Sequence, residues 1–196
     1  ITKGKPEVKK IYVSVSAPRT SESPNKNAQG LSDSKTKENY LLEVAASLER
    51  LSEHPLAKAI VNHANLKKYK EVKSFKILRG GGVEGTISKK KIVIGNTTLM
   101  KERKINLKNF EDKIEEFENN GFTTMVVSEN SKVIGIIGVA DAVKDDSIQA
   151  INALKMGNYK TVMITGDNER TAKAIAKEVG IDEVIANVLP EEKAKK

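Results

Sequence analysis

The sequence predicts an α/β fold built from two parts. After Asp141, helical and strand patterns alternate, which is typical of a parallel α/β sheet. Before Asp141, two helical patterns precede a series of short strand patterns and a hairpin, which indicates an antiparallel α+β part. We expect the first strand of the chain to join the parallel sheet, so that the α+β part is an insertion with a hinge near Asp141.

Length and composition limit the classes of protein to consider. The 196 residues suffice for one or two domains, and 38% of them are hydrophobic, enough for a packed core. The absence of cysteine excludes disulfides and thiolate metal sites. No apolar stretch approaches the roughly 18 residues that span a bilayer, and no signal-peptide pattern opens the chain. Because the sequence does not begin with Met, we expect it to be a piece of a longer protein.

The net charge of +8 arises from 34 basic and 26 acidic residues. A basic balance favours anionic partners. The lysines, however, are mixed with acidic residues, and the basic clusters at 9–10 and 89–91 contain no aromatic residues. Nucleic-acid binding is therefore a minor alternative, and it predicts strongly salt-dependent association.

The first predicted element is a strand at 11–15, in which alternate residues are apolar. Residues 16–35 are polar and nearly free of large apolar side chains, which is typical of a flexible linker. Two helices follow, at 37–51 and 55–65, because their apolar residues recur at helical spacing.

Short apolar runs and turn signals predict the remaining elements. They are strands at 74–78, 86–87 and 92–94, a helix at 109–119, a hairpin of 124–128 and 132–139, a helix at 147–156, a strand at 161–164, a helix at 169–179 and a strand at 183–186.

Three segments carry groups suited to chemistry. The first is Thr165-Gly166-Asp167-Asn168, between a predicted strand and a predicted helix. Backbone N–H groups and the positive end of the helix dipole can hold a phosphate at such a turn, and the carboxylate could face a magnesium ion. On the tetrapeptide alone, a turn in which Asp or Asn merely caps the helix is the more common structure.

The second segment, residues 80–85, matches G-x-G-x-x-G. A strand pattern rather than a helix follows it, which argues against a dinucleotide fingerprint. Glycines nevertheless let a backbone approach a ligand closely, and an ordinary hairpin turn is an equally frequent use of such a run.

The third segment is Ser52-Glu53-His54-Pro55-Leu56, which places His54 at a helix start. The helix dipole disfavours a positive charge there, and a neutral imidazole could stack on a base or hydrogen-bond to it. Glu49, five residues earlier, could accept a hydrogen bond from an exocyclic amine. Exposure or helix capping is the commoner role of a lone histidine, and His63 is expected to have no other.

Together these motifs resemble the heavy-metal-transporting P-type ATPases, in which Ser-Glu-His-Pro-Leu, Gly-x-Gly, Gly-Asn and Thr-Gly-Asp occur in this order. The resemblance covers the chain except residues 16–35. The opening residues 1–4 resemble the segment after the family's Asp-Lys-Thr-Gly-Thr phosphorylation motif, and residues 189–193 resemble the segment that carries its phosphate-site lysine.

The resemblance implies ATP and Mg²⁺ as cofactors and assigns a role to each site residue. The residues that would surround the nucleotide are Glu49 and His54 at the adenine, with Gly80, Gly82, Gly95, Asn96 and Asp141. Thr165 and Asp167 would face the transferred phosphoryl group and its magnesium, and Lys193 would neutralise charge. We expect His54→Gln or Gly82→Asp to weaken nucleotide binding with the fold intact.

The resemblance also implies a domain organisation. A nucleotide-binding domain at residues 37–140 would be inserted into a partial haloacid-dehalogenase-like phosphorylation domain, formed by residues 1–36, which include the linker, and 141–196. The expected partners are ATP or ADP and the membrane and actuator domains of the same polypeptide, with this chain in the cytoplasmic region of an integral membrane protein. The family's nucleophilic aspartate is not among these residues, so we expect nucleotide binding without turnover.

Copper is the favoured transported ion, because residues 95–100 resemble the copper branch more than the zinc and cadmium branch. The alternatives are a fragment of a zinc- or cadmium-transporting ATPase and a haloacid-dehalogenase-type phosphatase with a cap domain. Such a phosphatase would need an Asp-x-Asp motif at the end of the first strand, and the sequence has none there.

Overall fold

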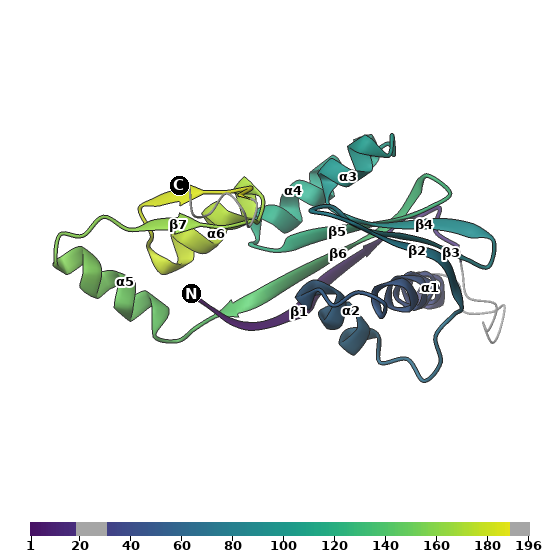
Figure 1. Cartoon of the computed structure of the whole chain (residues 1–196), viewed down its shortest axis with the longest axis horizontal. Coiled ribbons are helices and arrows are strands. Elements are labelled where there is room, and N and C mark those ends of the chain that lie inside the picture. Colours follow the sequence, from purple (N-terminus) through teal and green to yellow (C-terminus); the bar gives the residue numbers. More distant parts are fainter. Residues whose placement is uncertain (19–30, 189–196) are drawn as a thin grey trace.

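The computed structural model describes residues 1–18 and 31–188. Within them the chain forms a six-stranded antiparallel sheet and a separate two-stranded parallel sheet, which lies toward one end of the molecule with α5 and α6 (Figure 1). The predicted α/β fold with an antiparallel α+β part is confirmed.

In chain order the elements are β1 (Thr2–Val13), α1 (Leu31–Glu49), α2 (Pro55–Ala64), β2 (Val72–Leu78), β3 (Gly82–Ile87), β4 (Lys90–Gly95), α3 (Thr97–Glu102), the 3₁₀ turn η1 (Lys108–Phe110), α4 (Glu111–Asn119), β5 (Thr123–Glu129), β6 (Lys132–Val143), α5 (Ser147–Met156), β7 (Val162–Ile164), α6 (Glu169–Val179) and β8 (Glu183–Ile185).

The strands of the large sheet lie in the order β1-β6-β5-β4-β3-β2. β1 pairs antiparallel with β6, from Thr2 opposite Val143 to Val13 opposite Gly135. The prediction that the first strand joins the parallel sheet is therefore wrong. The reason is its apolar face, on which Val8, Ile11 and Val13 pack against the same core as α1 and α2.

The large sheet has a hydrophobic core on each face, as expected for strands whose successive side chains point in opposite directions. In β4, Ile92 and Ile94 pack with α1 and α2. Val93, between them, packs on the other face with the segment from α3 to α4, where Phe117 is fully buried. The sheet is thus the middle layer of three.

Several boundaries differ from the predicted ones. α1 begins at Leu31, inside the stretch predicted as a linker, while residues 19–30 lie outside the described part of the chain. α3 was not predicted, because six residues are too few to show helical periodicity. The hairpin between β5 and β6 is confirmed, with Asn130 and Ser131 in the left-handed region at φ 46° and 65°.

The smaller sheet is a β-α-β unit of β7, α6 and β8. The two strands are parallel, with Val162 opposite Glu183 and Ile164 opposite Ile185, as the alternating pattern predicted. Ala172 and Ala176 of α6 pack against Met163 of β7. None of the helices in the described ranges combines the length and hydrophobicity needed to cross a bilayer.

Candidate functional site

The glycine turn and the start of α3 form one structure, although they are separated in sequence. The Asn96 amide donates to the carbonyl oxygen of Gly81 at 2.9 Å, and its side-chain Nδ2 donates to the carbonyl oxygen of Gly80 at 3.0 Å. Asn96 Oδ1 accepts from the Leu99 amide at 2.9 Å and so caps α3. One asparagine therefore fixes both the glycine turn and the helix.

Gly82 and Gly95 face each other as paired residues of β3 and β4. A Cβ on Gly82 would overlap the carbonyl oxygen of Ile94, and Gly82 also has a φ of 150°, which side chains rarely adopt. A Cβ on Gly95 would overlap the carbonyl oxygen of Gly81. These glycines permit the close approach of two strands, so the geometry argues that Gly82→Asp would disturb the strand pairing as well as any nucleotide site.

A cavity of about 260 Å³ opens beside this turn. Gly80 and Asn96 line it, whereas Gly82 and Gly95 do not. Sequence reasoning missed the other polar residues of its wall, which are Arg79, Thr98, Glu102 and Arg103. The spacing of Thr98 and Glu102 would have indicated a shared face if the short helix after Asn96 had been recognised.

Glu49 is the last residue of α1 and only 2% exposed. Burial away from water raises the pKa of its carboxyl group to about 7. Within the described ranges, its Oε1 has no hydrogen-bond partner. The neighbouring Leu48 lies against β3, since a Cβ on Gly85 would stand 2.7 Å from its Cδ1.

His54 is exposed and caps α2, as its predicted position at the helix start requires. Its Nδ1 accepts from the Leu56 amide at 3.3 Å, so the ring proton resides on Nε2. Ser52 links it to Glu49: the Ser52 amide donates to the Glu49 carbonyl oxygen at 2.8 Å, and Ser52 Oγ accepts from the His54 amide at 3.3 Å. Glu49 and His54, the two residues predicted to contact adenine, therefore lie at the two ends of one short connection between α1 and α2.

Asp141 lies on β6 and binds the backbone of β1. Its carboxylate accepts from the amides of Gly4 and Lys5 at 2.8 and 3.0 Å. This is where the pairing of β1 with β6 is irregular, between Thr2 and Pro6. The carboxylate compensates amides that the ladder leaves unpaired. Its proximity to a nucleotide stays a prediction.

The turn after β7 combines a helix cap with a carboxylate. Asn168 caps α6, because its Oδ1 accepts from the Thr171 amide at 3.0 Å. The Thr165 hydroxyl donates to Asp167 Oδ2 at 2.8 Å, and the Thr123 hydroxyl of β5 donates to Asp167 Oδ1 at 3.2 Å. Both carboxylate oxygens are thus oriented by hydroxyl groups. Mg²⁺ held by a single carboxylate takes its remaining ligands from phosphate oxygens and water.

Lys193 lies outside the described residues. Across residues 1–18 and 31–188, no three His, Cys, Asp or Glu side chains gather in a way that would hold a metal ion. A larger cavity, of about 660 Å³, lies between α1, the loop before β2 and the β3–β4 turn, but none of the predicted site residues lines it. The smaller cavity lies on the α3 face of the sheet, away from α1 and α2. The candidate site is therefore the glycine turn, the α1–α2 connection and the turn after β7.

Comparison with known proteins identifies the family. The family model for haloacid dehalogenase-like hydrolases matches residues 1–196. A copper-exporting P-type ATPase of Staphylococcus saprophyticus is 47% identical over 157 residues, which are 79% of this chain and 20% of that protein. That of Staphylococcus haemolyticus is 48% identical over 155 residues, 78% of this chain and 20% of that protein. The chain thus spans about a fifth of the length of these relatives.

Solved structures similar to this chain are also P-type ATPases. A zinc-transporting PIB-type ATPase in its E2.Pi state superposes with a TM-score of 0.63 at 33% identity, covering 99% of this chain and 28% of that one. The catalytic domain of the CPx-ATPase CopB-B, from a structure on conformational changes upon nucleotide binding, gives a TM-score of 0.65 at 27% identity over 99% and 60% of the two chains. The predicted resemblance to heavy-metal-transporting P-type ATPases is confirmed as a similarity to part of these proteins. The chain belongs to the haloacid dehalogenase-like hydrolase family.

Proposed function

We propose that this chain is the ATP-binding part of a P-type ATPase that transports copper, and that it lies in the cytoplasm beside the membrane and actuator domains of the same polypeptide. Residues 37–140 would form most of the nucleotide-binding domain, to whose sheet β1 contributes an outer strand, and residues 141–196 would belong to the phosphorylation domain. ATP would transfer its terminal phosphoryl group to the family's aspartate, which these residues do not include. The preference for copper rests on the similarity to copper-exporting ATPases.

One observation carries the proposal. The glycine turn and the Gly95-Asn96 step converge at one end of the β3–β4 pair. Ligand sites commonly combine a preformed concave surface with a few fixed polar groups, and backbone free of side chains permits a close approach. Oε1 of Glu49, which has no partner among the described residues, and the Nε2–H of His54 would supply an acceptor and a donor for the adenine ring.

The second part of the chain would act on the phosphates. Asp167 would hold the magnesium ion together with phosphate oxygens, and Thr165 would orient that carboxylate. The ion would neutralise phosphate charge when bound. Phosphoryl transfer depends mainly on positioning and charge stabilisation, so two oriented groups on a rigid turn suit it.

The test is calorimetric titration of the chain with ATP, AMP and GTP in the presence of Mg²⁺. His54→Asn keeps a side-chain oxygen that caps α2 but removes the imidazole ring. We expect it to weaken ATP binding by about tenfold, because one ring contact with a base contributes roughly 1–3 kcal/mol. His63→Asn, on the exposed last turn of the same helix, is the control and should bind like the parent. Equal affinities for all three chains would place the adenine elsewhere.

A further inference from the structure

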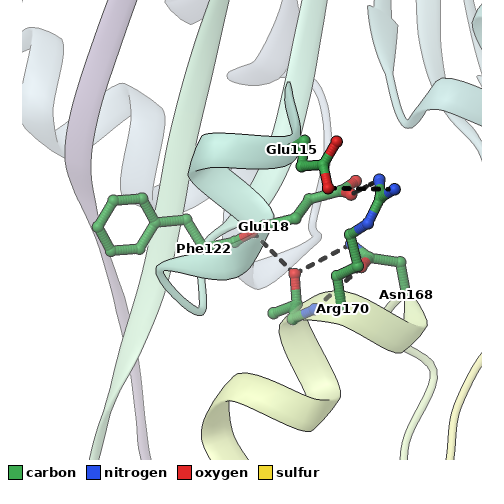
Figure 2. A network of polar contacts seen from close by, with 6 residues as sticks. Glu115, Glu118, Phe122, Asn168 and Arg170 are labelled. Carbon is green, nitrogen blue, oxygen red and sulfur yellow. Dashed lines mark hydrogen bonds and ion pairs between the residues drawn. The ribbon is translucent and has the colours of Figure 1, made fainter. Parts of the chain in front are cut away.

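The β-α-β unit is attached to the large sheet by polar contacts between α6 and α4. Figure 2 shows Arg170 of α6 directed at Glu115 and Glu118 of α4. Arg170 Nη1 lies 3.3 Å from Glu118 Oε2, and its Nη2 lies 3.6 Å from Glu115 Oε1. The Glu118 side chain is only 8% exposed, whereas that of Glu115 is 52% exposed. A buried carboxylate is costly without a partner, so Arg170 is the group that makes its burial tolerable.

Two further hydrogen bonds join the region around the start of α6 to the start of β5, one through Thr171 and one through Asp167. The Thr171 hydroxyl donates to the carbonyl oxygen of Phe122 at 2.9 Å, while Asn168 Nδ2 donates to that same hydroxyl at 3.0 Å (Figure 2). One residue further along the chain, the Thr123 hydroxyl donates to Asp167 Oδ1. The helix cap, the carboxylate and the start of β5 are thus one connected network.

We propose that Arg170 and Thr123 are positioning residues for Asp167. Arg170 holds the first turn of α6 against α4, and Thr123 orients the Asp167 carboxylate from the edge of the nucleotide-binding part. This inference rests on the proposed function, since it concerns the group assigned to magnesium and phosphate. It extends that function by giving the antiparallel sheet a direct part in orienting a residue of the phosphorylation part.

The sequence offered no sign of this role. Arg170 stands in the charged run Asp167-Asn168-Glu169-Arg170, which is typical of a solvated helix start, and Thr123 opens an ordinary strand. Lys173, one turn after Arg170, provides a comparison on the same helix. Its ion pair is with Glu169 of the same helix, at 2.6 Å, and both side chains are largely exposed.

The first experiment measures how the two parts are oriented without any nucleotide. Residual dipolar couplings of backbone amides should fit one alignment for α6 and the large sheet in the parent chain. We expect Arg170→Gln and Thr123→Val to lose that common alignment, and the matched control Lys173→Gln to keep it. The docking role is overturned if both test variants retain the alignment of the parent, or if the parent itself shows none.

The second experiment tests positioning by comparing MgATP with AMP in calorimetric titrations. Arg170→Gln should weaken MgATP binding by roughly fivefold, a typical coupling between two sites, and leave AMP binding unchanged, because AMP lacks the terminal phosphates. Equal effects on both ligands, or none on either, overturn the positioning role. A parent chain that binds neither ligand overturns the proposed function and the positioning role with it, whereas the dipolar couplings still report the docking contact.

Discussion

The buried carboxyl group of Glu49 predicts a specific dependence of stability on pH. Burial raises its pKa from 4.5 to about 7, because the charged form loses hydration that no partner in the described residues replaces. The perturbation is Glu49→Gln, which keeps the shape of the side chain and removes the ionisable group. We chose it because a single cause, desolvation, accounts for the shift.

The sign follows from proton binding. Between pH 4.5 and pH 7 the folded chain holds a proton on Glu49 that the unfolded chain has released, so stability falls as the pH rises. The rise of the Glu49 pKa from 4.5 to about 7 corresponds to about 3 kcal/mol of stability, because a tenfold change in proton affinity is worth roughly 1.4 kcal/mol. This contribution is fully present below the unfolded pKa and is lost above the folded one.

The assay is urea denaturation of the parent and Glu49→Gln at several values from about pH 4 to pH 8. Other titrating groups are shared by both chains, so the difference between their free energies of unfolding isolates Glu49. We expect the parent to lose about 3 kcal/mol relative to the variant across this range. Parallel curves would refute the reasoning, since they would mean that Glu49 ionises as it does in water.

Two further predictions concern backbone geometry and capping. Gly82→Ala should destabilise the chain by about 2–4 kcal/mol through the overlap with Ile94 and the unfavourable φ, measured by urea denaturation. Gly81→Ala is the control, and an equal loss there would contradict the argument. Asn168→Ala should cost about 1 kcal/mol by removing the cap on Thr171, whereas Asn168→Ser should restore most of it in thermal unfolding; equal melting temperatures would contradict the capping role.

Much of the fold was predictable because it depends on local patterns. The helix at α6 and the strand–helix–strand order around it follow from apolar spacing and from turn residues. The partner of β1 was not predictable, because alternating apolar residues indicate a strand without indicating the strand beside it. The choice depends on a core assembled from α1, α2 and five other strands, far away in sequence.

The site residues also divide into those that a local pattern indicates and those whose role depends on packing between distant segments. His54 was found because it stands at a predicted helix start, where its side chain has a local role that the sequence displays. Asn96 was found only through the family resemblance, because the short helix that it caps was not predicted. Arg170 and Glu118 were missed, because a charged residue on a helix is predicted to be exposed to solvent. Only the folded structure shows that α6 packs against α4 and brings the two together. Glu49 was singled out for its place beside His54, yet its burial emerges only from the packing of α1 on the sheet.

The pairing of β1 with β6 has a consequence for how the protein folds. Roughly 120 residues separate Val13 from its partner Gly135, so closing that loop carries a large entropic cost before any contact compensates it. The four strands from β2 to β5 are joined by shorter connections and can associate first. During synthesis, the apolar residues of β1 therefore stay exposed until β6 has been made and can pair with it.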